Sequence, residues 1–84
     1  MKEFTEYIYS PCIGNVEKIF VDQNSYVYEW EKLMLIRTSD DETLEIKTGV
    51  SGRIVSVEVT ENQLVTSDTI LMKLKDHFLF TGSE

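Results

Sequence analysis

The sequence is poor in the residues that form cross-links, metal sites and catalytic groups. Its 84 residues include one cysteine, one histidine, one proline and four glycines. The single cysteine, Cys12, excludes an internal disulfide and fits a reducing compartment. The single histidine, His77, lacks the partners that a zinc site or a Ser-His-Asp triad requires. Since there is no glycine-rich phosphate loop either, we expect no enzyme activity, no metal and no cofactor.

Long apolar runs and basic charge are also scarce. No stretch approaches the roughly 20 apolar residues of a membrane-spanning helix, and the first residues do not join a basic start to an apolar run as a signal peptide does. Fifteen acidic residues against eight basic ones give a formal net charge of −7. Such a charge repels nucleic-acid phosphates. We therefore expect a monomeric cytoplasmic protein that binds neither membranes nor nucleic acid.

What is present fits one small globular domain over residues 1–84. Apolar residues make up 42% of the chain and charged residues 27%, an ordinary globular balance. Residues 77–84 are expected to form a tail, and the segment 76–80 to add either an edge strand or an apolar extension.

The chain contains two similar halves. One constant offset lays the segment 8–36 on the segment 46–74 without a gap. Identical residues then coincide at Ile8 and Ile46, Gly14 and Gly52, Val21 and Val59, Asn24 and Asn62, Val27 and Val65, Leu33 and Leu71, and Met34 and Met72. Because a repeat of this kind constrains the fold, we predict a structural pseudo-repeat.

Each half has the pattern of short strands rather than helices. Short runs such as 33–36 and 70–74 are apolar, 54–59 is rich in β-branched residues, and no window shows helical periodicity. The polar stretches 22–25 and 60–63 read as turns, in which an asparagine takes the left-handed conformation. Two such halves predict an all-β domain of two sheets packed face to face with quasi-twofold symmetry.

Four stretches in order resemble the biotin/lipoyl attachment domain family: 10–14, 21–27, 39–46 and 49–55. The resemblance covers about residues 8–75. It implies a flattened barrel or sandwich of two four-stranded antiparallel sheets with quasi-twofold symmetry, also called a barrel-sandwich hybrid. One family feature is absent, because the loop glycine before the third strand is replaced by Trp30 and Asp68 in the two halves.

In that family a lysine at a hairpin tip carries biotin or lipoate through an amide. Counting back from Ile46, the tip position holds Asp41, and a register shifted by one residue places Asp40 there. Neither carboxylate can form the amide. The tip, with the neighbours Ser39 and Glu42, is then a solvated turn, a recognition element for a basic partner, or a divalent-cation site, although adjacent carboxylates cannot surround an ion.

The resemblance without its lysine implies a non-enzymatic carrier-like domain that acts as a protein-interaction or accessory module. Two alternatives stay open. One is a genuine biotin/lipoyl carrier modified at Lys47, which follows in the next strand. The other is a free-standing relative of the lipoyl domains of efflux adaptors.

Three aromatic residues alternate along one stretch and form the candidate partner surface. Tyr26, Tyr28 and Trp30 would share one face if the stretch were extended, and exposed tryptophan and tyrosine are frequent binding anchors. The alternative is that they cover a small core. Trp30 is the strongest candidate, because it falls in an expected loop and its counterpart in the second half is Asp68.

Overall fold

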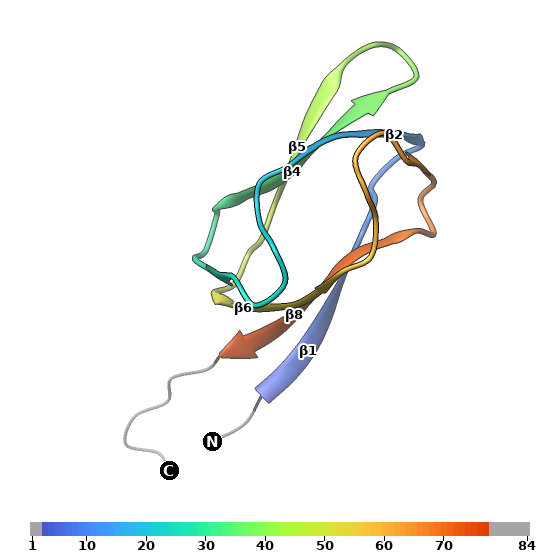
Figure 1. The fold of residues 1–84 in the computed structure, drawn as a ribbon. Coiled ribbons are helices and arrows are strands. Elements are labelled where there is room, and N and C mark those ends of the chain that lie inside the picture. The colour runs from blue at the N-terminus through green and yellow to red at the C-terminus, as the bar shows by residue number, and fades with distance from the viewer. Residues whose placement is uncertain (1–2, 78–84) are drawn as a thin grey trace.

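The computed structural model describes residues 3–77, which form eight strands and no helix (Figure 1). In chain order the strands are β1 (Glu3–Tyr9), β2 (Gly14–Ile19), β3 (Tyr26–Val27), β4 (Lys32–Thr38), β5 (Thr43–Lys47), β6 (Gly52–Val57), β7 (Leu64–Val65) and β8 (Ile70–His77). The predicted tail 77–84 begins one residue too early, since His77 still belongs to β8. The remainder of that tail, 78–84, lies outside the described residues.

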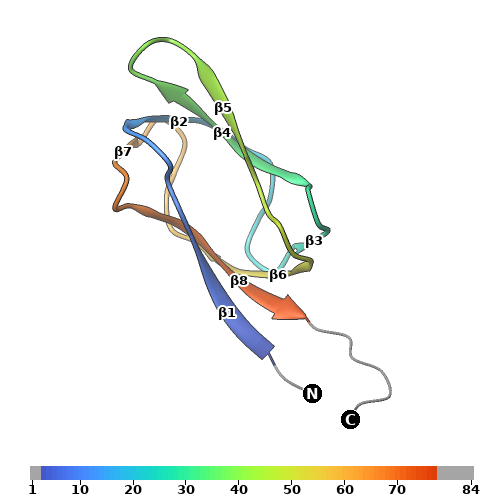
Figure 2. The same ribbon diagram turned by 180° about the vertical axis from the view of Figure 1, so that it is seen from behind.

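The strands form two four-stranded sheets, with the orders β1-β8-β6-β3 and β5-β4-β2-β7. Every pairing is antiparallel. The sheets lie face to face, and the β4–β5 hairpin is at the opposite end of the molecule from the start of β1 and the end of β8 (Figures 1 and 2). This confirms the predicted all-β sandwich. It also places residues 76–77 in the inner strand β8 and not in an added edge strand.

The two sheets correspond strand by strand at the offset that lays Gly14 on Gly52. Both ends of β2 fall on the ends of β6 at this offset, and both ends of β3 fall on those of β7. Both β2 and β6 carry a bulge at the same place, between Val16 and Lys18 and between Ile54 and Ser56. A bulge bends a strand and increases its twist. The shared positions therefore give both sheets the same curvature around the core.

The turns before β3 and β7 depend on an asparagine in each half. Asn24 has a φ of 73° and Asn62 a φ of 74°, which is the left-handed region. Asparagine tolerates this region better than most residues. The amide of Asn24 donates to the Ile54 carbonyl and that of Asn62 to the Val16 carbonyl, both at 2.7 Å. The predicted left-handed turns are thus confirmed, and each ties one half to the other.

Gly14 and Gly52 begin β2 and β6 because the neighbouring strand leaves no room for a side chain. A Cβ atom on Gly14 would meet the carbonyl oxygen of Arg37, and one on Gly52 would meet that of Lys75. Both approaches would be closer than 3.0 Å, which real Cβ atoms essentially never show. The glycines thus permit the close approach of β2 to β4 and of β6 to β8.

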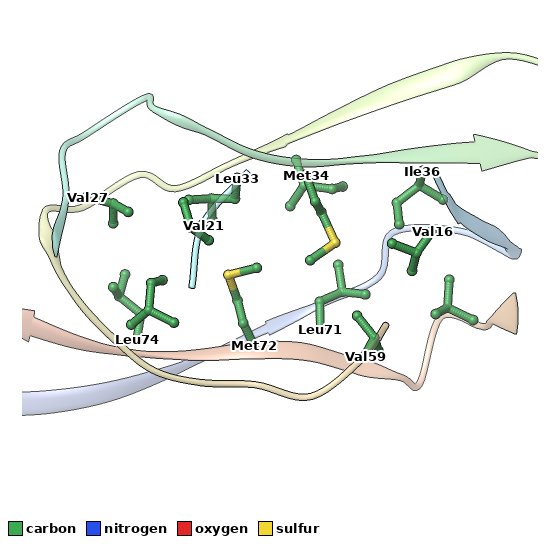
Figure 3. Close-up of a cluster of buried hydrophobic side chains, with 13 residues drawn as sticks. Val16, Val21, Val27, Leu33, Met34, Ile36, Val59, Leu71, Met72 and Leu74 are labelled. Carbon is green, nitrogen blue, oxygen red and sulfur yellow. The ribbon is translucent and has the colours of Figure 1, made fainter. Parts of the chain in front are cut away.

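The core fills the space between the sheets (Figure 3). Met34 of β4 and Met72 of β8 point toward each other from opposite sheets. Both are fully buried, and the cluster of buried apolar residues comprises Val16, Val21, Val27, Leu33, Met34, Ile36, Ile46, Ile54, Val59, Val65, Leu71, Met72 and Leu74. Because the core side chains are buried, the hairpin tip, the loops and the outer sheet faces are left as candidate sites.

Within residues 3–77 the structure has no helix of the length and hydropathy that a membrane crossing needs.

Candidate functional site

The β4–β5 hairpin closes through a three-residue loop with Asp41 as its last residue. The Thr38 amide donates to the Glu42 carbonyl at 2.7 Å, and the Asp41 amide donates to the Thr38 carbonyl at 3.0 Å. Asp41 has a φ of 67°. These two hydrogen bonds with a left-handed last residue are the pattern of many three-residue hairpin loops. The backbone thus sets Asp41 in the loop of the hairpin, just before Glu42 and the start of β5.

The Thr38 hydroxyl organises the rest of the tip. Its Oγ1 accepts hydrogen bonds from the amides of Asp40, at 3.2 Å, and Glu42, at 3.1 Å. The tip amides are therefore satisfied within the loop. Ser39, Asp40, Asp41 and Glu42 are all exposed. The tip is therefore an exposed turn whose carboxylates are available to solvent or to a partner.

Arg37 is the cationic partner of the tip. Its Nη1 lies 3.5 Å from Asp41 Oδ1, and its Nη2 lies 2.8 Å from Glu17 Oε2. The pKa of Arg37 is raised, mainly by the hydrogen bond and charge of Glu17 and less by Asp41. Arg37 stays charged, and its contact with Asp41 is an exposed ion pair of little strength. In the part of the chain that the structure describes, no group of three or more Asp, Glu, His or Cys side chains could hold a metal ion.

Lys47 lies at the other end of β5 from the tip. Its Nζ is 3.5 Å from Glu45 Oε1, and Lys32 approaches the second oxygen of the same carboxylate at 3.2 Å. Lys47 is directly opposite Lys32 in the β4–β5 ladder. Lys47 is thus a residue of a sheet surface and not of a protruding turn.

The three predicted aromatic residues are exposed and do not cover the core. Tyr26, Tyr28 and Trp30 are 42%, 65% and 67% exposed. The extended stretch that would align all three ends at Val27, where β3 ends. The rings of Tyr26 and Tyr28 nevertheless pack edge to face, with centroids 5.1 Å apart and planes at 69°. We call these three residues the aromatic loop.

The backbone holds the aromatic loop against the segment between β5 and β6. The Trp30 amide donates to the Thr48 carbonyl at 2.7 Å, and the Glu29 amide donates to Ser51 Oγ at 3.2 Å. Within the loop, the Glu31 amide donates to the Tyr28 carbonyl at 2.9 Å. Trp30 has a φ of 70°. A bulky residue in the left-handed region is strained and often marks a functional position.

The second half builds the equivalent turn without aromatic residues. Thr66 and Asp68 stand at the places of Tyr28 and Trp30, and the amide of Thr69 donates to the Thr66 carbonyl at 2.9 Å. Among the described residues, the left-handed non-glycine positions include Trp30 but not Asp68. The turn therefore requires neither the indole nor its left-handed backbone. This comparison separates the aromatic loop from what the fold itself demands.

Sequence reasoning missed a second cluster, on the outer surface of the β5-β4-β2-β7 sheet. The Nζ atoms of Lys18 and Lys32 lie 6.0 and 5.8 Å from the centre of the Phe20 ring, within cation–π distance. Glu45 sits between Lys32 and Lys47, and these two lysines lower the pKa of its carboxyl, Lys32 more strongly. We call Lys18, Phe20, Lys32, Glu45 and Lys47 the lysine face. No contiguous pattern in the sequence marks this cluster, because its lysines come from three strands that are brought together by sheet pairing.

Comparison with known proteins adds evidence on the fold. No family model and no curated protein matches the chain. A single-chain, multi-domain long-chain acyl-CoA carboxylase is similar in structure, with a TM-score of 0.80, 15% identity and 88% of this chain covered. The urea carboxylase of Kluyveromyces lactis is similar with a TM-score of 0.77, 14% identity and the same coverage. The chain corresponds to only 7% and 6% of those two chains. The fold is therefore one that occurs as a small part of carboxylases.

Proposed function

We propose that this chain is a biotin/lipoyl-carrier-like domain that lacks the attachment lysine, is not an enzyme, and binds a protein partner. The observation that carries the proposal is Asp41. It occupies the last position of the tip loop, is 87% exposed at its side chain, and is a carboxylate where a carrier needs an amine. A carboxylate cannot form the amide that would hold biotin or lipoate.

The fold supports the carrier-like part of the proposal. The sequence resembles the biotin/lipoyl attachment family, and the chain shares its fold with parts of two carboxylases. The sandwich also presents the β4–β5 hairpin at one end, away from the ends of β1 and β8 (Figure 1). This is the arrangement expected of a domain that is recognised through a protruding hairpin.

The aromatic loop supports the partner-binding part. Trp30 and Tyr28 are exposed by about two thirds, and Trp30 keeps a left-handed backbone that its counterpart Asp68 does without. Left-handed strain of this kind costs about 1–2 kcal/mol and clusters at functional positions. Exposed tryptophan and tyrosine are the residues that most often carry binding energy. We assign the aromatic loop as the partner surface.

The absence of the cofactor is tested by intact-mass measurement after co-expression with a biotin ligase and, separately, with a lipoate ligase. We expect an unmodified mass for the wild type with either ligase. Asp41→Lys is the informative companion, because it supplies the missing amine at the same position. A mass increase on the wild type would overturn the proposal, and its loss in Lys47→Arg would identify Lys47 as the modified residue.

Partner binding is tested by affinity capture from the native cells with matched variants. Trp30→Ala removes the indole, whereas Asp68→Ala makes the same truncation at the equivalent position of the other half. We expect a partner that the wild type and Asp68→Ala both retain and Trp30→Ala loses. Equal capture by all three proteins would contradict the assignment of the aromatic loop.

A further inference from the structure

The lysine face has a charge opposite to that of the chain that carries it. Its three lysines outnumber its single glutamate, whereas the whole chain has a formal charge of −7. The side chains of Lys32, Glu45 and Lys47 are 44–46% exposed. Local charge at an exposed surface steers a partner of opposite sign. Glu61 adds a second carboxylate, because its Oε2 accepts from the Ile19 amide between Lys18 and Phe20. Three lysines against two carboxylates still leave a positive charge that attracts an anionic partner.

The fold does not require this cluster. The pseudo-repeat gives each of its positions an equivalent position in the other sheet, where the corresponding strands pair in the same order. Those positions hold Ser56 for Lys18, Glu58 for Phe20, Ile70 for Lys32, Tyr7 for Glu45 and Tyr9 for Lys47. Not one of the five is a lysine, so the sandwich forms equally well without the positive charge.

The arrangement is also unfavourable for an isolated domain. Lys32 and Lys47 are direct cross-strand partners in the β4–β5 ladder. Like charges in that position repel each other, and one carboxylate, Glu45, is shared by both ammonium groups. Each ammonium has three donors, so both retain donors for a further anion. A bound carboxylate would relieve the repulsion that Glu45 alone offsets in part.

The chemistry of the surface defines its occupant. The Phe20 ring is 44% exposed beside Lys18 and Lys32, so an apolar contact lies next to the charges. Strand β5 is the edge strand of its sheet. An edge strand can pair with an extended segment of another chain. We propose that the lysine face binds an extended acidic polypeptide segment, with carboxylates on the lysines and an apolar side chain on Phe20.

A nucleic acid fits this surface less well than a short acidic segment. The same hairpin that carries Lys32 and Lys47 ends in Asp40, Asp41 and Glu42. A long polyanion that followed β5 would meet these carboxylates, whereas a short peptide ends before them. The net charge of −7 opposes long polyanions as well. This inference goes beyond the proposed function, because it concerns a surface separate from the aromatic loop.

The test is an NMR titration of the isotope-labelled chain with a synthetic peptide of alternating glutamate and leucine. We expect amide shift changes that concentrate at residues 18–20, 32–35 and 43–47, and binding that weakens as salt is raised. The same peptide with glutamine in place of glutamate, and a single-stranded oligothymidine, are titrated in parallel. Stronger binding of the oligothymidine would overturn the proposal, as would equal binding of the glutamine peptide.

Two charge-matched double variants locate the site. Lys32→Gln with Lys47→Gln removes two positive charges from the lysine face, and Lys73→Gln with Lys75→Gln removes two from the other sheet. We expect the first pair to weaken peptide binding about tenfold and the second to change it less than about twofold. Equal losses would show attraction by net charge alone and would overturn the proposal. A dispersed spectrum of each variant verifies that it is folded.

Discussion

Met34 and Met72 point toward each other across the centre of the core from the inner strands of opposite sheets (Figure 3). They are equivalent positions of the pseudo-repeat, related by the same offset that relates β2 to β6 and β3 to β7. Each is fully buried. The pair therefore lies where the two halves of the chain meet, and each half contributes the same residue to this contact.

This relationship predicts equal and large losses of stability from truncation at either position. Met34→Ala and Met72→Ala should each lower the free energy of unfolding by about 2–5 kcal/mol, as buried methionines do. Met34→Leu and Met72→Leu, which nearly conserve volume, should each cost less than about 1.5 kcal/mol. Urea unfolding followed by circular dichroism measures all four. A loss confined to one position would contradict the equivalence of the halves.

Gly14 and Gly52 are predicted to tolerate no side chain. Gly14→Ala and Gly52→Ala press a Cβ against a backbone carbonyl oxygen, and backbone cannot move aside as a side chain can. Overpacking of this kind costs about 1–3 kcal/mol or more, so we expect the urea midpoint to fall sharply in both variants. Gly49→Ala is the control, because no atom lies within 4 Å of its added Cβ. A midpoint of Gly49→Ala as low as the others would show that the loss is not steric.

Much of this fold could be predicted from the sequence because its determinants are local and occur twice. Asn24 and Asn62 mark left-handed turns, and both lie at one offset. The close approach that Gly14 permits could not be predicted, because it depends on the Arg37 carbonyl of a paired strand distant in sequence. The end of β8 was missed for a similar reason, since its last residues are fixed by pairing with β1.

We predict that the Trp30 side chain contributes to partner binding and not to the stability of the fold. Because the side chain is 67% exposed and the φ is 70°, Trp30→Gly removes little buried surface and relieves a left-handed strain of about 1–2 kcal/mol. Glycine lowers the free energy of unfolding by about 0.5–1 kcal/mol, because it increases the entropy of the unfolded chain. We therefore expect an unfolding free energy that is unchanged or up to about 1.5 kcal/mol higher, with capture of the partner lost. A clear loss of stability in urea would mean that the indole supports the fold.

The candidate sites were less accessible to sequence reasoning than the fold. The aromatic loop was found from alternation, and the loop predicted around Trp30 is confirmed, because the turn after Val27 reverses the chain. The lysine face was missed because Lys18, Lys32 and Lys47 come from three strands and meet only through sheet pairing. The loop that holds Asp41 could be located because a hairpin turn is contiguous in sequence, whereas its equivalence to the family lysine stays a prediction.

The ion pair between Glu45 and Lys32 predicts a pH-dependent coupling. Lys32, at 3.2 Å, and then Lys47 hold the pKa of the Glu45 carboxyl below its ordinary value of 4.5. A carboxyl whose pKa is lower in the folded state stabilises the fold above the pKa of the unfolded chain, and this contribution is lost as the pH falls through the folded value. The coupling is therefore present at neutral pH and disappears in acid. Both groups are exposed, so salt should weaken it.

A double-mutant cycle of Glu45→Gln and Lys32→Gln measures this coupling from the four urea midpoints. We expect a small favourable coupling at about pH 7 that is absent at about pH 2, where the carboxyl is protonated in both states. The same cycle in high salt should reduce the value at neutral pH. A coupling of the same size at both pH values would mean that the two side chains interact through packing of their methylene groups and not through charge.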